Sequence, residues 1–124
     1  MKKVLVVDDE KEVAEFILEV LLEEKEFEAT AVYSAHEAIK MLVANEFHLV
    51  ITDVIMPEIN GLELTEHIFN NYPDIKVLAC SGGGESGKLV AGMALDQALE
   101  EGADNALLKP FSSEELLMKV RRLI

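Results

Sequence analysis

Hydrophobic and polar positions follow two alternating patterns along the chain. Short runs that are almost wholly apolar, such as Val4–Val7 and Leu49–Ile51, are typical of strands buried on both faces of a parallel sheet. The stretches between these runs repeat apolar residues every three or four positions, which is typical of amphipathic helices. The pattern therefore predicts strands and helices that alternate along the whole chain.

Five strands and five helices can be placed on this pattern. The predicted strands cover residues 3–7, 28–33, 48–52, 76–80 and 105–108. The predicted helices cover about 10–24, a stretch from Ser34, about 62–72, 88–101, and a stretch from Ser112. Ser34 and Ser112 each stand three residues before a glutamate, which is a capping-box signature. This alternation predicts an α/β fold, (βα)5, with a parallel sheet, right-handed crossovers and helices on both faces.

Length and composition narrow the class of protein. A chain of 124 residues that is 50% hydrophobic is expected to form one domain, 1–124, which is either a stand-alone protein or part of a longer one. Its net charge of −13 argues against nonspecific binding to nucleic acids or anionic membranes, which requires a basic surface. The single cysteine, Cys80, cannot form an internal disulfide, and no apolar run approaches the ~20 residues of a membrane span. We expect a cytoplasmic domain.

Polar side chains follow four of the five predicted strands. They are Asp8 and Asp9 after the first strand, Asp53 after the third, Ser81 after the fourth and Lys109 after the fifth. The carboxyl ends of parallel strands meet at one edge of the sheet, where open α/β sheets bind ligands, so we expect these side chains to lie close together. Two like charges about 4 Å apart repel by about 4 kcal/mol at an effective dielectric near 20. Three carboxylates there require a cation, a proton or a basic side chain.

The side chains at this edge favour phosphoryl chemistry. Carboxylate oxygens with space left for water suit Mg²⁺. Lys109 can neutralise a tetrahedral anion as a point charge, and the Ser81 hydroxyl can donate a hydrogen bond to another oxygen of that anion. One carboxylate remains as a nucleophile. These are the parts of a site that accepts a phosphoryl group on aspartate.

Four sequence features together resemble one known family, the receiver domains of bacterial two-component response regulators. They are VLVVDDE at 4–10, ITDVIMPEINGLEL at 51–64, Ser81, and LLKPF at 107–111. The resemblance extends over essentially the whole chain. It implies a flavodoxin-like doubly wound sandwich similar to chemotaxis regulators, with a five-stranded parallel sheet in the order 2-1-3-4-5 and a cis bond between Lys109 and Pro110.

The same resemblance implies a function and roles for named residues. Asp53 would accept a phosphoryl group from the phosphohistidine of a histidine kinase or a phosphotransfer protein, while Lys109 contacts that group and Ser81 moves to hydrogen-bond it. The residues that would hold Mg²⁺ are Asp8, Asp9, Asp53 and, through its backbone carbonyl, Ile55. The domain would catalyse only its own phosphorylation and dephosphorylation, and would switch contacts with a downstream protein as a monomer or weak dimer.

Three alternatives remain compatible with these residues. An aspartate-nucleophile phosphatase usually carries a second acid two residues after the nucleophile, where this chain has Ile55. A flavodoxin-like cofactor binder needs neutral phosphate donors after the first strand, where this chain has Asp8, Asp9 and Glu10. A degenerate receiver would act only as an interaction module. Many receivers carry Tyr or Phe three residues before the lysine, whereas this chain has Ala106, which puts part of the family's switch in doubt.

Overall fold

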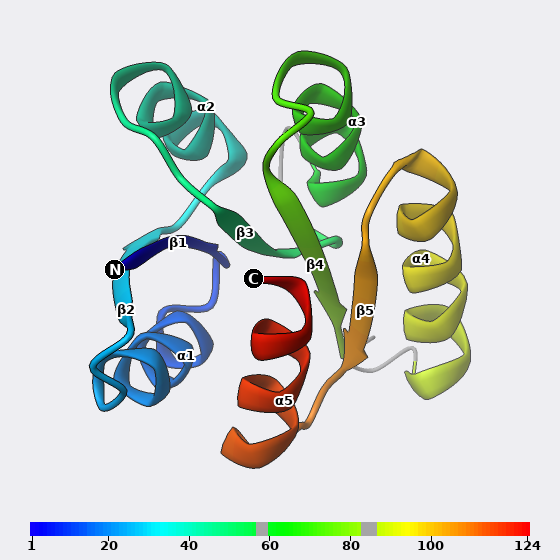
Figure 1. Cartoon of the computed structure of the whole chain (residues 1–124). Helices are drawn as coiled ribbons and strands as arrows, with labels where there is room; N and C mark the ends of the chain where they lie inside the picture. Colours follow the sequence, from blue (N-terminus) through cyan, green and yellow to red (C-terminus); the bar gives the residue numbers. More distant parts are fainter. Residues whose placement is uncertain (57–59, 83–86) are drawn as a thin grey trace.

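A parallel sheet of five strands lies between two layers of helices in the computed structural model, which describes residues 1–56, 60–82 and 87–124 (Figure 1). The strands are β1 (Lys2–Val7), β2 (Phe27–Val32), β3 (Leu49–Asp53), β4 (Lys76–Ser81) and β5 (Asn105–Leu108). The helices are α1 (Lys11–Leu22), α2 (Ala35–Ala44), α3 (Gly61–Asn71), α4 (Gly87–Glu101) and α5 (Ser113–Leu123). The strand order is β2-β1-β3-β4-β5, so the predicted fold class and order are confirmed.

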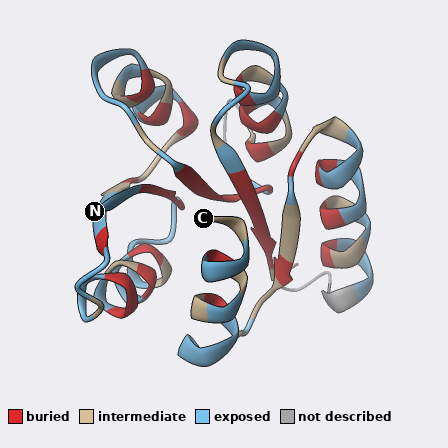
Figure 2. Ribbon diagram, in the orientation of Figure 1, coloured by how far each residue is buried: buried red, intermediate tan, exposed pale blue. Residues whose placement is uncertain are grey.

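The pleat of the strands divides the apolar side chains between two cores. Leu5 and Val7 of β1 belong to the core covered by α2, α3 and α4, whereas Val4 and Val6 belong to the core covered by α1 and α5. Every residue of β3 is buried, and Figure 2 shows burial concentrated in the central strands and the inward faces of the helices. Burial on both faces explains why these strands read as continuous apolar runs.

Three helices begin with the side-chain caps that their sequences favour. The hydroxyl of Ser34 accepts from the Glu37 backbone N–H at 3.1 Å, and Ser112 forms a complete capping box with Glu115. The Asn60 side chain accepts from the Glu63 backbone N–H at 3.0 Å, which starts α3.

Among the described helices, none is both long and apolar enough to cross a membrane.

β3 and β4 each extend one residue further at the carboxyl end than predicted, and both extensions bear on the sheet edge. Asp53 and Ser81 are the last residues of β3 and β4 rather than the first residues after them. Asp53 pairs with Cys80 in the ladder, and the Lys109 backbone N–H donates to the Ser81 carbonyl at 2.9 Å. The predicted strands stop at Thr52 and Cys80, because a polar residue follows each of them, whereas the backbone pairing continues for one more residue.

Candidate functional site

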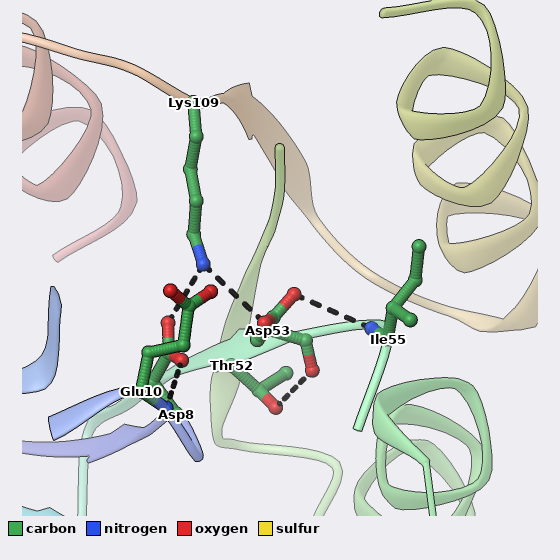
Figure 3. Close-up of polar contacts among 6 residues, drawn as sticks. All are labelled: Asp8, Glu10, Thr52, Asp53, Ile55 and Lys109. Atoms are coloured by element: carbon green, nitrogen blue, oxygen red, sulfur yellow. Dashed lines mark hydrogen bonds and ion pairs between the residues drawn. The ribbon is translucent and has the colours of Figure 1, made fainter. Parts of the chain in front are cut away.

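Two buried carboxylates meet one ammonium at the carboxyl edge of the sheet (Figure 3). Asp8 follows β1 and Asp53 ends β3, and their side chains are 2% and 7% exposed. The Lys109 Nζ donates to Asp8 Oδ2 at 2.8 Å and to Asp53 Oδ2 at 3.3 Å. Lys109 thus contacts two acids that precede it in the sequence by 101 and 56 positions. The predicted positions of all three residues at strand ends had placed them together.

Backbone groups hold the remaining oxygens of both carboxylates. Asp8 Oδ1 accepts from the Glu10 backbone N–H at 3.0 Å, and Asp53 Oδ1 accepts from the Ile55 backbone N–H at 3.3 Å. The Thr52 hydroxyl donates to the Asp53 backbone carbonyl at 2.9 Å. The Ile55 backbone N–H therefore lies beside the Asp53 carboxylate, and both buried acids are held in one orientation.

Glu10 is the third carboxylate near this ammonium, and the sequence-based site had omitted it. Among the described residues, Asp8, Glu10 and Asp53 each offer an oxygen within 4.8 Å of the other two. Asp9, which was predicted to hold Mg²⁺ with Asp8 and Asp53, is exposed and follows Asp8 directly, and its part in metal binding stays a prediction.

Ser81 lies at the same edge but makes no hydrogen bond to the acids. Because Asp53 pairs with Cys80, the pleat places Ser81 on the opposite face of β4, together with Ala79. Its hydroxyl is fully buried and has no hydrogen-bond partner among the described residues. An unpaired buried hydroxyl costs about 1–3 kcal/mol, which favours any rearrangement that gives it an acceptor.

The pKa values of Asp53 and Cys80 distinguish these two possible nucleophiles. The pKa of Asp53 is raised from 3.8 to about 6, chiefly by burial and in part by the charge of Asp8, while Lys109 and the Ile55 N–H oppose the rise. Burial acts to lower the pKa of Lys109, but the hydrogen bond to Asp8 and the charges of Asp53 and Asp8 outweigh burial and raise it. Burial raises the pKa of the Cys80 thiol to about 12, which keeps it protonated and inert.

Gly61 allows α3 to approach the end of β3 very closely. A Cβ atom at this position would overlap the backbone carbonyl oxygen of Asp53 and lie 2.6 Å from the Val54 Cα. The Gly61 N–H donates to the Val54 carbonyl at 3.1 Å. The glycine therefore permits the close contact between the first turn of α3 and the end of β3.

Comparison with known proteins identifies the family. Residues 4–121 match the family model described as the response regulator receiver domain. The chain belongs to this family. The resemblance seen in its motifs is confirmed, and the domain is a receiver domain of two-component signalling. Receiver domains bind Mg²⁺ at an acidic pocket, and the acidic cluster of this receiver domain lies at the sheet edge.

Individual relatives agree with the family match. The receiver domain is 34% identical to the response regulator ArlR of Staphylococcus saprophyticus, in an alignment that covers 100% of this chain and 53% of that protein. It therefore spans about half the length of this curated relative. The receiver domain of the Francisella response regulator 1452 has a TM-score of 0.83 and 28% identity, covering 99% of this chain and 96% of that one. The BeF3-activated receiver domain of DrrB has a TM-score of 0.84 and 26% identity, covering 99% and 97%.

The Lys109–Pro110 bond and Ala106 are two further features for which there were sequence-based expectations. The Lys109–Pro110 bond is cis, as the resemblance implied. Ala106 is half-buried and packs beside the core covered by α2, α3 and α4. Residues 57–59 and 83–86, which include Pro57, Gly83 and Gly84, lie outside the described part. Family membership favours the receiver interpretation over a cofactor binder or a phosphatase.

Replacing Asp53 with asparagine is expected to stabilise the cation-free receiver domain at pH 8 by on the order of 2 kcal/mol. Because the folded-state pKa of Asp53 is raised to about 6, its favourable contribution is complete below pH 3.8 and is lost as pH rises through 6. The difference between variant and wild type should therefore grow from pH 4 to pH 8. Denaturant unfolding followed by circular dichroism, with a chelator present, measures it.

The matched control for this prediction is Asp96→Asn, because Asp96 is exposed on α4. It should change the unfolding free energy by less than about 0.5 kcal/mol at either pH. An Asp53→Asn difference that stays constant between pH 4 and pH 8 would contradict the raised pKa.

Proposed function

We propose that this receiver domain accepts a phosphoryl group on Asp53 in a reaction that depends on Mg²⁺. The observation that carries the proposal is the charge at the site: three neighbouring carboxylates face one ammonium, so two negative charges remain unbalanced. Such a cluster is stable only with a further positive charge or a proton. The domain would act as a phosphorylated signalling module and not as an enzyme on external substrates.

The side chains present fit a divalent cation. Hard cations such as Mg²⁺ prefer oxygen ligands and keep several waters, and this edge offers carboxylate oxygens open to solvent on the Glu10 side. The residues proposed from the sequence to hold the ion are Asp8, Asp9, Asp53 and the backbone carbonyl of Ile55. When bound, Mg²⁺ supplies charge neutralisation for the transferred phosphoryl group.

In the proposed transfer, Asp53 and Lys109 each have one role. With a pKa of about 6, Asp53 is mainly the nucleophilic carboxylate at pH 7–8. Its oxygen forms a bond to phosphorus as the phosphorus–nitrogen bond of the donor phosphohistidine breaks, and the imidazole nitrogen keeps that electron pair. The Lys109 ammonium, already 3.3 Å from Asp53 Oδ2, would contact the new phosphoryl group.

Ser81 would give its hydroxyl a partner in the phosphorylated state. The buried hydroxyl lacks an acceptor among the described residues, and phosphoryl oxygens are strong acceptors. Because the pleat places it on the opposite face of β4, the end of this strand would have to move. Movement of Ser81 would couple phosphorylation of Asp53 to the segment that leads into α4.

The proposed partners follow from this chemistry. A histidine kinase or phosphotransfer protein would donate the phosphoryl group, and a downstream protein would recognise the changed surface. We propose that 1–124 is a single receiver domain that works in the cytoplasm, as a monomer or weak dimer, without direct contact with nucleic acid or membrane.

Incubation with acetyl phosphate and Mg²⁺, followed by intact mass measurement, tests the proposed chemistry. We expect wild type to gain one phosphoryl group, and we expect no gain for Asp53→Asn or when a chelator is present. The exposed-site control Asp96→Asn should gain the group as wild type does. An undiminished gain in Asp53→Asn would show that another residue is the acceptor.

A further inference from the structure

We propose that the open edge of β2 binds an extended, basic peptide segment of a partner protein as an added strand. β2 is the outermost strand on its side of the sheet, and no described strand lies beyond it (Figure 1). All six of its residues, Phe27–Val32, pair with β1 on the inner side. Strand addition to a sheet edge is a recurring mode of peptide recognition. The proposal concerns a surface away from the acidic cluster and does not depend on the phosphoryl chemistry.

The pairing with β1 determines which backbone groups of β2 face outward. The Asp8 N–H donates to the Val32 carbonyl at 3.2 Å, and the register between the two strands is unbroken. Even-numbered residues of β2 therefore face β1, because successive backbone groups of a strand point to opposite sides. The N–H and C=O groups of Ala29 and Ala31 consequently point to the open edge. Within the described part of the chain, no backbone hydrogen bond outside the regular ladders involves either residue.

The β2 edge lacks the features that usually prevent strand pairing. Proline, lysine, a bulge or a very short strand protects most exposed edges. Phe27–Val32 contains neither proline nor lysine and has no bulge, whereas β5 at the opposite edge has only four residues. The Phe27 N–H donates to the Glu24 carbonyl at 3.4 Å, so the free N–H groups begin at Ala29. An incoming strand would therefore find two donors and their neighbouring carbonyls unpaired.

A small cavity beside this edge can hold one side chain of the added strand. Glu28 and Thr30 point to the same face as Val32, which belongs to the core covered by α2, and both are exposed. They line a cavity of about 120 Å³ together with the apolar side chains of Met41 and Phe47. A lysine or arginine of the added strand would lay its apolar stem along Met41 and Phe47 and place its charge beside Glu28.

Charge favours a basic partner over a second copy of this chain. The net charge of −13 makes two copies repel each other, whereas a basic segment is attracted. Glu28 is the charged residue of β2, and Lys3 approaches its carboxylate only to 3.9 Å. Both side chains of this pair are about half exposed, at 49% and 56%, so it is a weak surface pair that an incoming cation can replace.

Titration with a synthetic peptide, followed by nuclear magnetic resonance, tests the proposal on the full chain. The probe is a short peptide in which lysine alternates with valine. The control peptide has the same sequence and charge, but two successive central residues carry backbone N-methyl groups, so each of its edges loses one N–H. We expect the control peptide to bind about tenfold more weakly. We also expect the Ala29 and Ala31 amides to gain protection from hydrogen exchange with the unmodified peptide.

Ala29→Pro tests the same edge from the side of the protein. Proline removes the outward N–H of residue 29 and leaves the N–H groups that pair with β1, and edge strands tolerate it. We expect Ala29→Pro to weaken binding of the unmodified peptide about tenfold. Ala29→Ser is the matched control, because it changes the side chain but keeps the N–H, and it should bind as wild type does. If Ala29→Pro does not fold, the two peptides still decide the question on wild type.

Several outcomes would overturn the proposal. Equal affinities of the two peptides would show that charge alone accounts for binding. Failure of wild type to bind the unmodified peptide, or binding without protection of Ala29 and Ala31, would exclude this edge as the site. A wild-type dimer in sedimentation equilibrium that Ala29→Pro disrupts would assign the edge to a second copy of the chain instead.

Discussion

Replacing Lys109 with methionine is expected to lower the free energy of unfolding by about 3–5 kcal/mol at pH 8 when no divalent cation is present. Methionine keeps the apolar stem but removes the ammonium that contacts both Asp8 and Asp53. Two buried carboxylates would then repel each other without a counterion. Denaturant unfolding followed by circular dichroism measures the loss.

The size of this loss should depend on pH. Lys109 lowers the pKa of Asp53, so its removal raises that pKa further above 3.8. A carboxyl group with a raised folded-state pKa contributes stability at low pH that disappears as pH rises through that value. The deficit relative to wild type should accordingly be smaller at pH 5 than at pH 8, and adding Asp53→Asn should reduce it at pH 8.

Lys119→Met provides the control for Lys109→Met. The Lys119 Nζ donates to the neutral Asn105 Oδ1 at 3.1 Å, so its loss leaves no buried charge unpaired. We expect a change below about 1 kcal/mol. Equal losses for Lys109→Met at pH 5 and pH 8 would show that packing, and not the ion pairs, accounts for the effect.

Gly61→Ala is expected to lower the free energy of unfolding by about 3 kcal/mol. The added methyl group would overlap the Asp53 carbonyl oxygen and lie 2.8 Å from the Asp53 carbonyl carbon. These atoms belong to the backbone of a buried strand, so neither can rotate away and α3 must shift from the sheet. The same unfolding assay measures the loss, and Mg²⁺ affinity should fall with it because Asp53 is displaced.

Gly92→Ala is the matched control, since it makes the same chemical change inside α4. Beyond its chain neighbours and the backbone of its own helix, a Cβ at Gly92 would meet no atom within 4 Å, so no repacking is required. Alanine is the better helix former, and we expect a gain of about 0.5–1 kcal/mol. A destabilised Gly92→Ala, or a neutral Gly61→Ala, would contradict the packing described for these two helices.

The alternation of elements could be predicted because each element buries a different pattern of positions. β1 and β3 are covered on both faces, so their sequences are unbroken apolar runs. α2 and α5 each bury one face, and the capping residues Ser34 and Ser112 mark where they begin. The convergence of Asp8, Asp53 and Lys109 followed from parallel strands having their carboxyl ends on one edge.

The details within the site could not be predicted, because they depend on the exact residue at which pairing stops. Asp53 and Ser81 still belong to their strands, which fixes the face on which each side chain lies. Asp53 pairs with Cys80, one residue before Ser81, so the Ser81 side chain lies on the other face of the sheet from the Asp53 side chain. The place of Glu10 in the cluster depends on how the chain turns from β1 into α1, where no apolar pattern guides the prediction.

The contact between Lys109 and Asp8 also constrains how the chain is made. These residues are 101 positions apart, and β1 lies between β2 and β3 at the interior of the sheet. During synthesis, the first strand and its acid therefore emerge long before their counterion does. Contacts this distant in sequence form late because closing a long loop costs entropy. A nascent chain that stops short of β5 would hold an uncompensated negative charge at the centre of its sheet, so the ion pair completes the fold as well as the site.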